Sequence, residues 1–172
     1  KIFEQLLTNL LDLFYKKPQV LSSKGKLIIT KLCSLLDCTQ IYTLLAKLIL
    51  EEYSSSSPSP SPQKGRNRNK SKSKKGSKKA SPSPSLENDI ASRQSKRRFV
   101  RNMVRLMNLI LLTTKELYPL REIIKKCDDE KSKQIFLTLY KTWCCSPISL
   151  VSLCLLAQRY DLGLMLVNQF KK

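Results

Sequence analysis

The chain has 172 residues, and its 32 lysines and arginines against 13 aspartates and glutamates give a formal net charge of +19 at neutral pH. It contains no histidine, the side chain that most often serves as a general base and as a metal ligand, and it lacks the GxGxxG, P-loop and HExxH patterns. We therefore expect no catalytic residue, no metal site and no cofactor, and the sequence argues against an enzyme.

The six cysteines do not follow the spacing of a zinc site or of a disulfide framework. No two of them form a CxxC pair, and most lie within apolar helical patterns, where cysteine behaves as a small hydrophobic residue. We expect free thiols in a reducing compartment. No membrane-spanning helix is predicted, because the uncharged stretch 142–158 is interrupted by Ser146-Pro147.

Two helices are predicted over the first 36 residues. Apolar residues recur at three- and four-residue spacing over 1–14, and two lysines followed by Pro18 end this helix. The chain starts inside this pattern without a methionine, so we expect it to be a piece of a longer protein. Ser22 or Ser23 is expected to cap the second helix, over about 25–36.

A third helix is expected after Asp37 or Thr39 as its cap, with one apolar face that includes Ile41, Leu45 and Ile49. Together these elements form a helical repeat pattern over residues 1–53. Such short amphipathic helices bury their apolar faces by stacking on one another or on a partner.

Residues 54–92 are predicted to form a disordered basic linker. Over 54–85 the chain is rich in serine, proline and lysine and has no aromatic or branched aliphatic side chain, so burial does not offset the entropy lost on ordering. From 54 to 98, thirteen lysines and arginines stand against Glu87 and Asp89, a net charge of +11. The tract is therefore either a solvated spacer or an electrostatic contact for anionic membrane lipid or nucleic acid.

Serines that precede proline in this tract are candidate sites of proline-directed phosphorylation. Each phosphate would add up to two negative charges and reduce the positive field. The candidates are Ser57, Ser59, Ser61, Ser81 and Ser83.

The helical pattern resumes near residues 92–95 and continues to about 112, with a second half that is apolar nearly all round and so is expected to be buried. The sequence from Thr113 to Glu116 resembles a capping box and opens a helix that runs to about Cys127. Because Pro119 falls inside this helix, either its first turn is irregular or the helix starts at the proline.

The remaining helices follow recognisable caps. Asp128 or Asp129 is expected to cap a helix that carries Trp143, and Ser146-Pro147 reads as N-cap and first helical position of the next, with Ile148, Val151 and Leu155 on its apolar side. Asp161 is expected to cap the last helix. No strand pattern of useful length occurs, and the fold class predicted for the chain is all-α.

The segment 138–170 carries the candidate partner contacts. Tryptophan and tyrosine dominate binding hot spots, and charged residues at helix ends are exposed. Trp143 has two open readings, as an interface anchor or as core between helices. The candidate partner-binding residues are Tyr140, Lys141, Trp143, Arg159 and Tyr160.

The sequence LYKTWCCSPISLVSLCLLAQRYDLGLMLV resembles the C-terminal region of the Vac-fourteen (Vac14) family. LMNLILLTTKELYPLREIIKK is similar to the preceding helices of that family, and SSKGKLIITKLCSLLDCTQIYTLLAKLILEE to an earlier part of the same region. Two departures stand out. Cys145-Ser146 occupies a place where the family usually has His-Asn, and the long basic tract replaces a short connection.

The resemblance implies an α-solenoid of HEAT- or armadillo-like repeats without catalytic activity, which self-associates and acts as a scaffold. The implied partners are a FYVE-containing phosphatidylinositol 3-phosphate 5-kinase and a Sac-type phosphoinositide phosphatase. The expected place is the cytoplasmic side of endosomal and vacuolar membranes, where the assembly controls phosphatidylinositol 3,5-bisphosphate.

Two other functions remain open from the residues alone. The basic tract could bind nucleic acid, but it has no interleaved aromatics for base stacking, so binding would be salt-dependent and blind to sequence. The tract could also bind anionic lipid directly, which is compatible with a scaffold.

Overall fold

The computed structural model describes residues 2–53 and 84–170, and within these ranges the chain is all-α, with no β-strand. This confirms the predicted fold class. The helices are α1 (Ile2–Lys16), α2 (Pro18–Leu35), α3 (Cys38–Leu48), α4 (Pro84–Thr113), α5 (Tyr118–Lys126), α6 (Glu130–Trp143), α7 (Pro147–Leu156) and α8 (Tyr160–Phe170). A π-helical turn, Ile49–Tyr53, follows α3, and a 3₁₀ turn, Lys115–Leu117, precedes α5.

Prolines begin helices at three places. Pro18, Pro84 and Pro147 are the first residues of α2, α4 and α7, a position where the missing N–H would have no partner in the helix. The prediction was right for Ser146-Pro147. The prediction that Ser22 or Ser23 caps the second helix was wrong, because α2 begins at Pro18 and both serines lie inside it, where their hydroxyls donate to backbone carbonyls one turn earlier.

Helix α4 also begins earlier than the sequence pattern indicates. It starts at Pro84, inside the segment 54–92 expected to be a linker, and runs for 30 residues. Residues 54–83, with the five candidate phosphorylation sites, lie outside the described residues, so disorder and phosphorylation there stay predictions.

Acidic residues and an irregular turn mark the other helix starts as predicted. Asp37 caps α3, accepting a hydrogen bond from the backbone N–H of Thr39 at 2.8 Å. Asp129 occupies the N-cap position of α6, where its carboxylate accepts from the Ser132 hydroxyl. The 3₁₀ turn before Pro119 is the irregular first turn expected there. Asp161, in contrast, lies inside the first turn of α8 and does not precede it.

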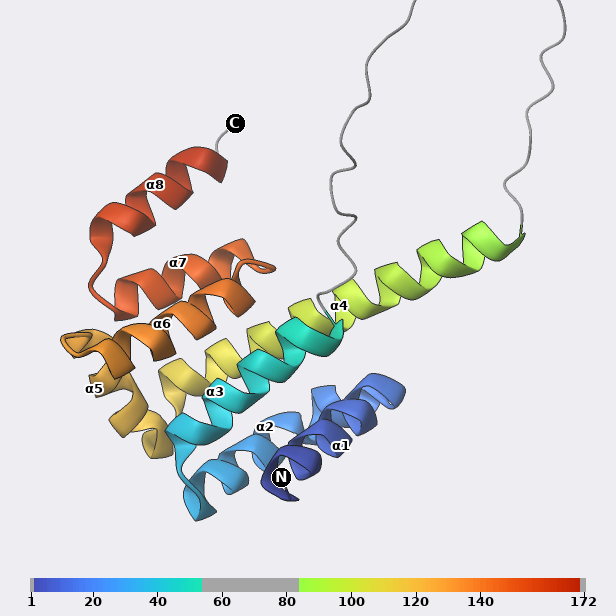
Figure 1. Cartoon of the computed structure of the whole chain (residues 1–172), viewed down its shortest axis with the longest axis horizontal. Coiled ribbons are helices and arrows are strands. Elements are labelled where there is room, and N and C mark those ends of the chain that lie inside the picture. The colour runs from blue at the N-terminus through green and yellow to red at the C-terminus, as the bar shows by residue number, and fades with distance from the viewer. Residues whose placement is uncertain (1, 54–83, 171–172) are drawn as a thin grey trace, which may run out of the picture.

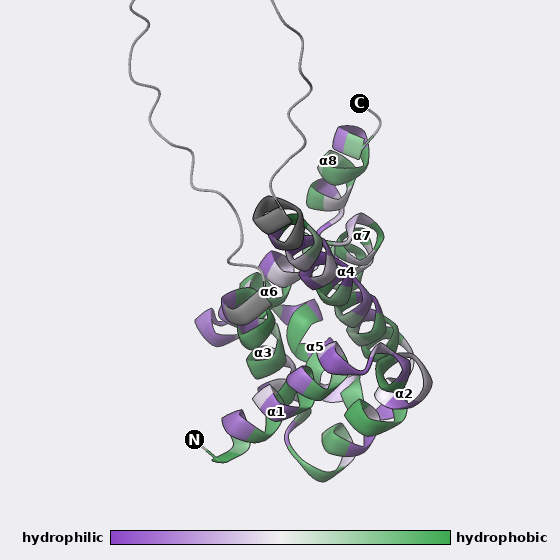
Figure 2. Ribbon diagram, turned by 90° about the vertical axis from the view of Figure 1, so that its right-hand side faces the viewer, coloured by the Kyte–Doolittle hydropathy of each residue, from purple (hydrophilic) through white to green (hydrophobic). Residues whose placement is uncertain are grey.

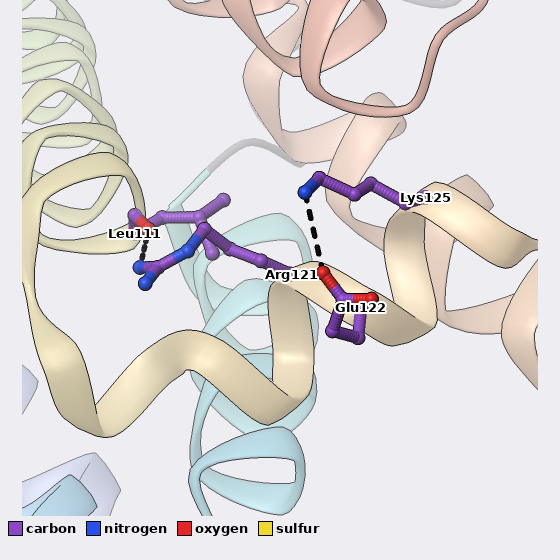
Figure 3. A network of polar contacts seen from close by, with 4 residues as sticks. All are labelled: Leu111, Arg121, Glu122 and Lys125. Atoms are coloured by element: carbon purple, nitrogen blue, oxygen red, sulfur yellow. Dashed lines mark hydrogen bonds and ion pairs between the residues drawn. The ribbon is translucent and has the colours of Figure 1, made fainter.

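One side chain closes the end of α4. Arg121, from the first turns of α5, donates from one guanidinium nitrogen to the carbonyls of Leu111 and Thr114, each at 2.8 Å. Figure 3 shows Arg121 reaching the Leu111 carbonyl, with the Glu122–Lys125 ion pair beside it. The last carbonyls of a helix have no partner within the helix, so this arginine supplies a donor to the carbonyl of Leu111, a buried residue in the last turn of α4.

The helices form a stack with α1 and α2 at one end and α8 at the other, so that the two ends of the chain lie far apart (Figure 1). Helix α4 packs against α2 on one side and α7 on the other, and α3 packs against α6. Hydrophobic residues occur on every labelled helix (Figure 2), and one buried core runs from Leu7 in α1 to Leu166 in α8.

Candidate partner interface

A polar network surrounds the indole of Trp143, which has no exposed surface. Its indole N–H donates to the side-chain oxygen of Asn108 at 3.0 Å, and the Asn108 amide nitrogen donates to the Ser152 hydroxyl at 3.0 Å. These three side chains come from α6, α4 and α7. A buried polar group needs such partners to offset the loss of water, so the network fixes the relative register of the three helices.

Trp143 therefore lies between helices, and its side chain does not reach the surface that a partner could touch. The residue before it contributes to the same packing, because the Thr142 hydroxyl donates to the Ala46 carbonyl of α3 at 3.1 Å. The other four candidate residues reach the surface. Lys141, Arg159 and Tyr160 are exposed, and Tyr140 is partly buried.

A helix-ending motif presents Arg159 and Tyr160. At the end of α7 the N–H of Arg159 donates to the Cys154 carbonyl at 2.9 Å, and the N–H of Gln158 donates to the Leu155 carbonyl at 3.1 Å. This pair of bonds is a Schellman motif, and it requires a left-handed residue, here Gln158 with φ of 57°. The chain reverses at this point, so Arg159 and Tyr160 project at the corner between α7 and α8.

Phe136 of α6 connects this corner with Tyr140. Arg159, Tyr160, Asp161 and Leu162 line a recess of about 340 Å³ that Phe136 also lines. The Phe136 ring lies 5.9 Å from the ring of Tyr140, one turn further along α6. The structure thus brings Tyr140, Arg159 and Tyr160 around Phe136, whereas Lys141 projects from α6 without a hydrogen bond or ion pair to any of them.

The α7–α8 hairpin also exposes apolar side chains that we did not predict as partner contacts. The exposed fraction is 81% for Ile148 and 62% for Leu164, and Met165 and Phe170 are exposed as well. A groove of about 390 Å³ runs between the two helices, and all but one of its lining residues are apolar: Pro147, Ile148, Val151, Ser152, Leu155, Val167 and Phe170.

Ile148 and Leu155, predicted to lie on the apolar side of this helix, do not face the core. The buried side of α7 instead carries Ser149, Leu150, Leu153 and Cys154. Helix α7 is apolar all round, so its sequence gives little preference for one face. Ser149 tolerates burial because its hydroxyl is hydrogen-bonded to that of Ser146 at 3.0 Å. In the sequence, the signal of this exposed apolar surface is the long uncharged stretch 142–158.

The electrostatics of this region do not favour nucleophilic chemistry. Burial raises the pKa of the Cys145 thiol to about 11, although the guanidinium of Arg101 opposes the shift, and burial also raises the pKa of Cys144. A nucleophilic cysteine needs the opposite, a pKa lowered toward neutrality. In the described part of the chain no group of three or more histidine, cysteine, aspartate or glutamate residues is placed to hold a metal ion.

The α6–α8 surface, which we define as Phe136, Tyr140, Arg159, Tyr160 and the apolar residues of the α7–α8 groove, is thus suited to binding another protein. Exposed apolar area of this kind, rimmed by polar side chains, marks interaction sites. At the end of a stack of helices it is also the face that a neighbouring element would cover. None of the helices in the described ranges is long and apolar enough to cross a membrane.

Comparison with known proteins identifies relatives over most of the chain. The family model that matches residues 85–172 is described as the C-terminal region of vacuolar protein 14 that binds the Fig-four protein. The chain is 30% identical to the "Protein VAC14 homolog" of Arabidopsis thaliana, over 92% of this chain and 16% of that protein. It is also 30% identical to the "Protein VAC14 homolog" of Schizosaccharomyces pombe, over 95% of this chain and 15% of that protein.

The "Vacuole morphology and inheritance protein 14" of Saccharomyces cerevisiae is 32% identical over 42% of the chain. No solved structure gives a significant match. The chain therefore spans about a sixth of the length of the two relatives that cover most of it.

Proposed function

This chain belongs to the Vac14 family, and we propose that it is part of a non-catalytic scaffold that holds a phosphoinositide phosphatase and a phosphoinositide kinase together. The observation that carries the proposal is the exposed α6–α8 surface, which lies wholly within residues 85–172, the part that matches a family model described by the binding of a partner protein. We assign this surface to a Sac-type phosphoinositide phosphatase.

The chemistry of the surface supports a protein partner. Rigid aromatic and long apolar side chains provide contact area at low entropic cost, and Arg159 and Tyr160 add polar contacts at the rim. The core beneath is held by the Trp143–Asn108–Ser152 network, so the surface is preorganised and little ordering is needed on binding.

The proposal extends to contacts beyond this surface. We infer that the assembled scaffold also holds a FYVE-containing phosphatidylinositol 3-phosphate 5-kinase, that copies of the scaffold associate with each other, and that the complex acts on the cytoplasmic side of endosomal and vacuolar membranes. The family resemblance supports these inferences. In this account the chain itself supplies no reacting group, and it acts on phosphatidylinositol 3,5-bisphosphate only through the enzymes it holds.

Co-purification tests the proposal. The complete scaffold, tagged in its own cell, is expected to capture both the Sac-type phosphatase and the kinase. The double substitution Ile148→Asp and Leu155→Asp puts two charges into the apolar groove and is expected to abolish capture of the phosphatase. The matched control is Leu27→Asp with Leu35→Asp, which changes two exposed leucines of α2 and is expected to keep it.

If the intact scaffold captures neither enzyme, the family fold has been retained without this function. If the groove variant and the control variant capture the phosphatase equally, the partner binds elsewhere. A thermal melt of each variant shows whether the helices remain folded.

A further inference from the structure

The first half of α4 is a basic helix with little protein packed around it. In Figure 1 it extends past the ends of the neighbouring helices. From residue 89 to residue 98 every side chain is exposed except that of Lys96, which is partly buried. Between residues 90 and 113 the helix has six lysines and arginines and no acidic residue: Arg93, Lys96, Arg97, Arg98, Arg101 and Arg105.

Three of these arginines follow one another at four-residue spacing. Residues four apart lie on the same face of a helix, so Arg97, Arg101 and Arg105 form a stripe about 12 Å long at 1.5 Å per residue. In the described part of the chain none of the three forms an ion pair. Ile90, seven residues before Arg97, lies on the same face and is 54% exposed.

A groove borders this stripe. It has a volume of about 400 Å³, at the lower end of the range for ligand sites, and lies between α4, the end of α1 and the start of α2. Arg98 and Arg105 line it, together with Ser95 and Asn102. The apolar side of the groove contains Leu21 and the edge-to-face pair of Tyr15 and Phe99, whose ring centres are 5.4 Å apart.

This combination suits a phosphate group on an apolar carrier. Guanidinium groups bind phosphate oxygens through paired, charge-assisted hydrogen bonds, and the serine hydroxyl and the asparagine amide are further polar partners for a sugar or inositol ring. The apolar side of the groove would contact the carbon skeleton of the carrier. A cluster of lysines and arginines on a helix is also attracted to the negative surface of anionic membranes.

We propose that the Arg97–Arg101–Arg105 stripe docks on an anionic phospholipid membrane, with the phosphorylated headgroup of a lipid in the groove between Arg98 and Leu21. The exposed Ile90 and the apolar side of the groove provide contact area for the carbon chains of a lipid. Nucleic acid is disfavoured because no aromatic side chain stands on the stripe for base stacking. The inference adds a direct membrane contact to the proposed scaffold and does not depend on the phosphatase.

Vesicle flotation with the whole chain tests the inference. The vesicles contain phosphatidylcholine alone, phosphatidylcholine with phosphatidylserine, or phosphatidylcholine with a phosphatidylinositol phosphate, the last two at equal surface charge. We expect binding to both charged vesicles and stronger binding to the phosphatidylinositol phosphate. A basic residue near an anionic surface contributes roughly fivefold to partitioning.

Two double substitutions separate the groove from a general effect of charge. Arg98→Gln with Arg105→Gln is expected to lower binding to charged vesicles at least tenfold and to remove the preference for the phosphatidylinositol phosphate. Lys131→Gln with Lys133→Gln removes the same charge from exposed positions of α6 and is expected to change binding less than twofold. Both variants retain residues 54–83, so binding through that tract is the same in each.

Three results would overturn the inference: equal binding by the two variants, binding of duplex DNA without binding of vesicles, or binding of the soluble inositol phosphate headgroup as tightly as the vesicles. The last result would show a site for a soluble ligand and no docking on a membrane.

Discussion

At the scale of single residues, the structure depends on a few buried polar side chains that join helices distant in the sequence. Asn108 accepts from Trp143 and donates to Ser152, and the Tyr42 hydroxyl donates to the Met107 carbonyl at 3.1 Å. The tryptophan could be recognised in the sequence, but its partner could not, because 35 residues separate the two and a lone asparagine in an apolar helix has no local signature.

Removing Asn108 should therefore destabilise the fold. Asn108→Ala leaves the indole N–H of Trp143 buried without an acceptor, which costs about 1–3 kcal/mol. Urea denaturation followed by circular dichroism measures this loss. Asn102→Ala changes an exposed asparagine of the same helix and should alter the free energy of unfolding by less than about 0.5 kcal/mol. Equal effects of the two variants would contradict the role of the network.

The buried Cys33 thiol and Tyr42 phenol lead us to expect a loss of stability at alkaline pH. Burial raises the pKa of Cys33 from 9.0 to about 12, and burial also raises the pKa of Tyr42 well above its usual value. The unfolded chain loses the thiol proton near pH 9, whereas the folded chain retains it to about pH 12. The stabilisation is therefore complete below pH 9 and is lost as the pH rises toward 12.

The free energy of unfolding should fall as the pH is raised above 9, and urea denaturation at successive pH values measures the slope. Cys33→Ala should reduce that slope, independently of any change it causes in the free energy of unfolding at neutral pH. An unchanged slope in this variant would show that the Cys33 thiol does not contribute.

At the scale of helices, local sequence predicts where elements exist better than where they begin or which face they bury. Asp37 was recognised as a cap because it precedes a periodic apolar run. Pro18 was predicted only to end the first helix, and Pro84 was placed within the linker. Both are in fact first helical residues, the position that was predicted for Pro147. The face of α7 could not be predicted, because a helix that is apolar all round is oriented by its neighbours.

The cap of α3 gives a direct prediction. Asp37→Ala removes the acceptor for the Thr39 N–H and should lower the free energy of unfolding by about 1 kcal/mol. Thermal denaturation is a sufficient measurement. Asp128→Ala, at an exposed position that makes no hydrogen bond among the described residues, is the matched control and should leave the midpoint nearly unchanged.

The turn that presents Arg159 and Tyr160 can be stabilised. Gln158 adopts φ of 57°, which costs a non-glycine residue about 1–2 kcal/mol, so Gln158→Gly should raise the free energy of unfolding by about 0.5–1 kcal/mol after the entropy of glycine is subtracted. Chemical denaturation tests this. A destabilised variant would mean that the Gln158 side chain makes contacts that outweigh the backbone strain.

At the scale of the whole molecule, the stack has a preorganised core and a last hairpin that is incompletely covered. Only Gly163 and Leu166 of α8 are buried, so this helix has apolar surface available for a partner. The all-α class and the Vac14 family were predicted from the sequence. The exposed groove was not, because exposure is a property of the stack and not of any one helix.

Hydrogen–deuterium exchange of the chain, alone and with the purified Sac-type phosphatase, tests the central claim most directly. We expect the phosphatase to slow exchange in α6–α8, above all around residues 147–170, and to leave exchange in α1–α3 unchanged. Slower exchange confined to α1–α3, or no change anywhere in a complex shown to have formed, would contradict the assignment of the α6–α8 surface as the partner interface.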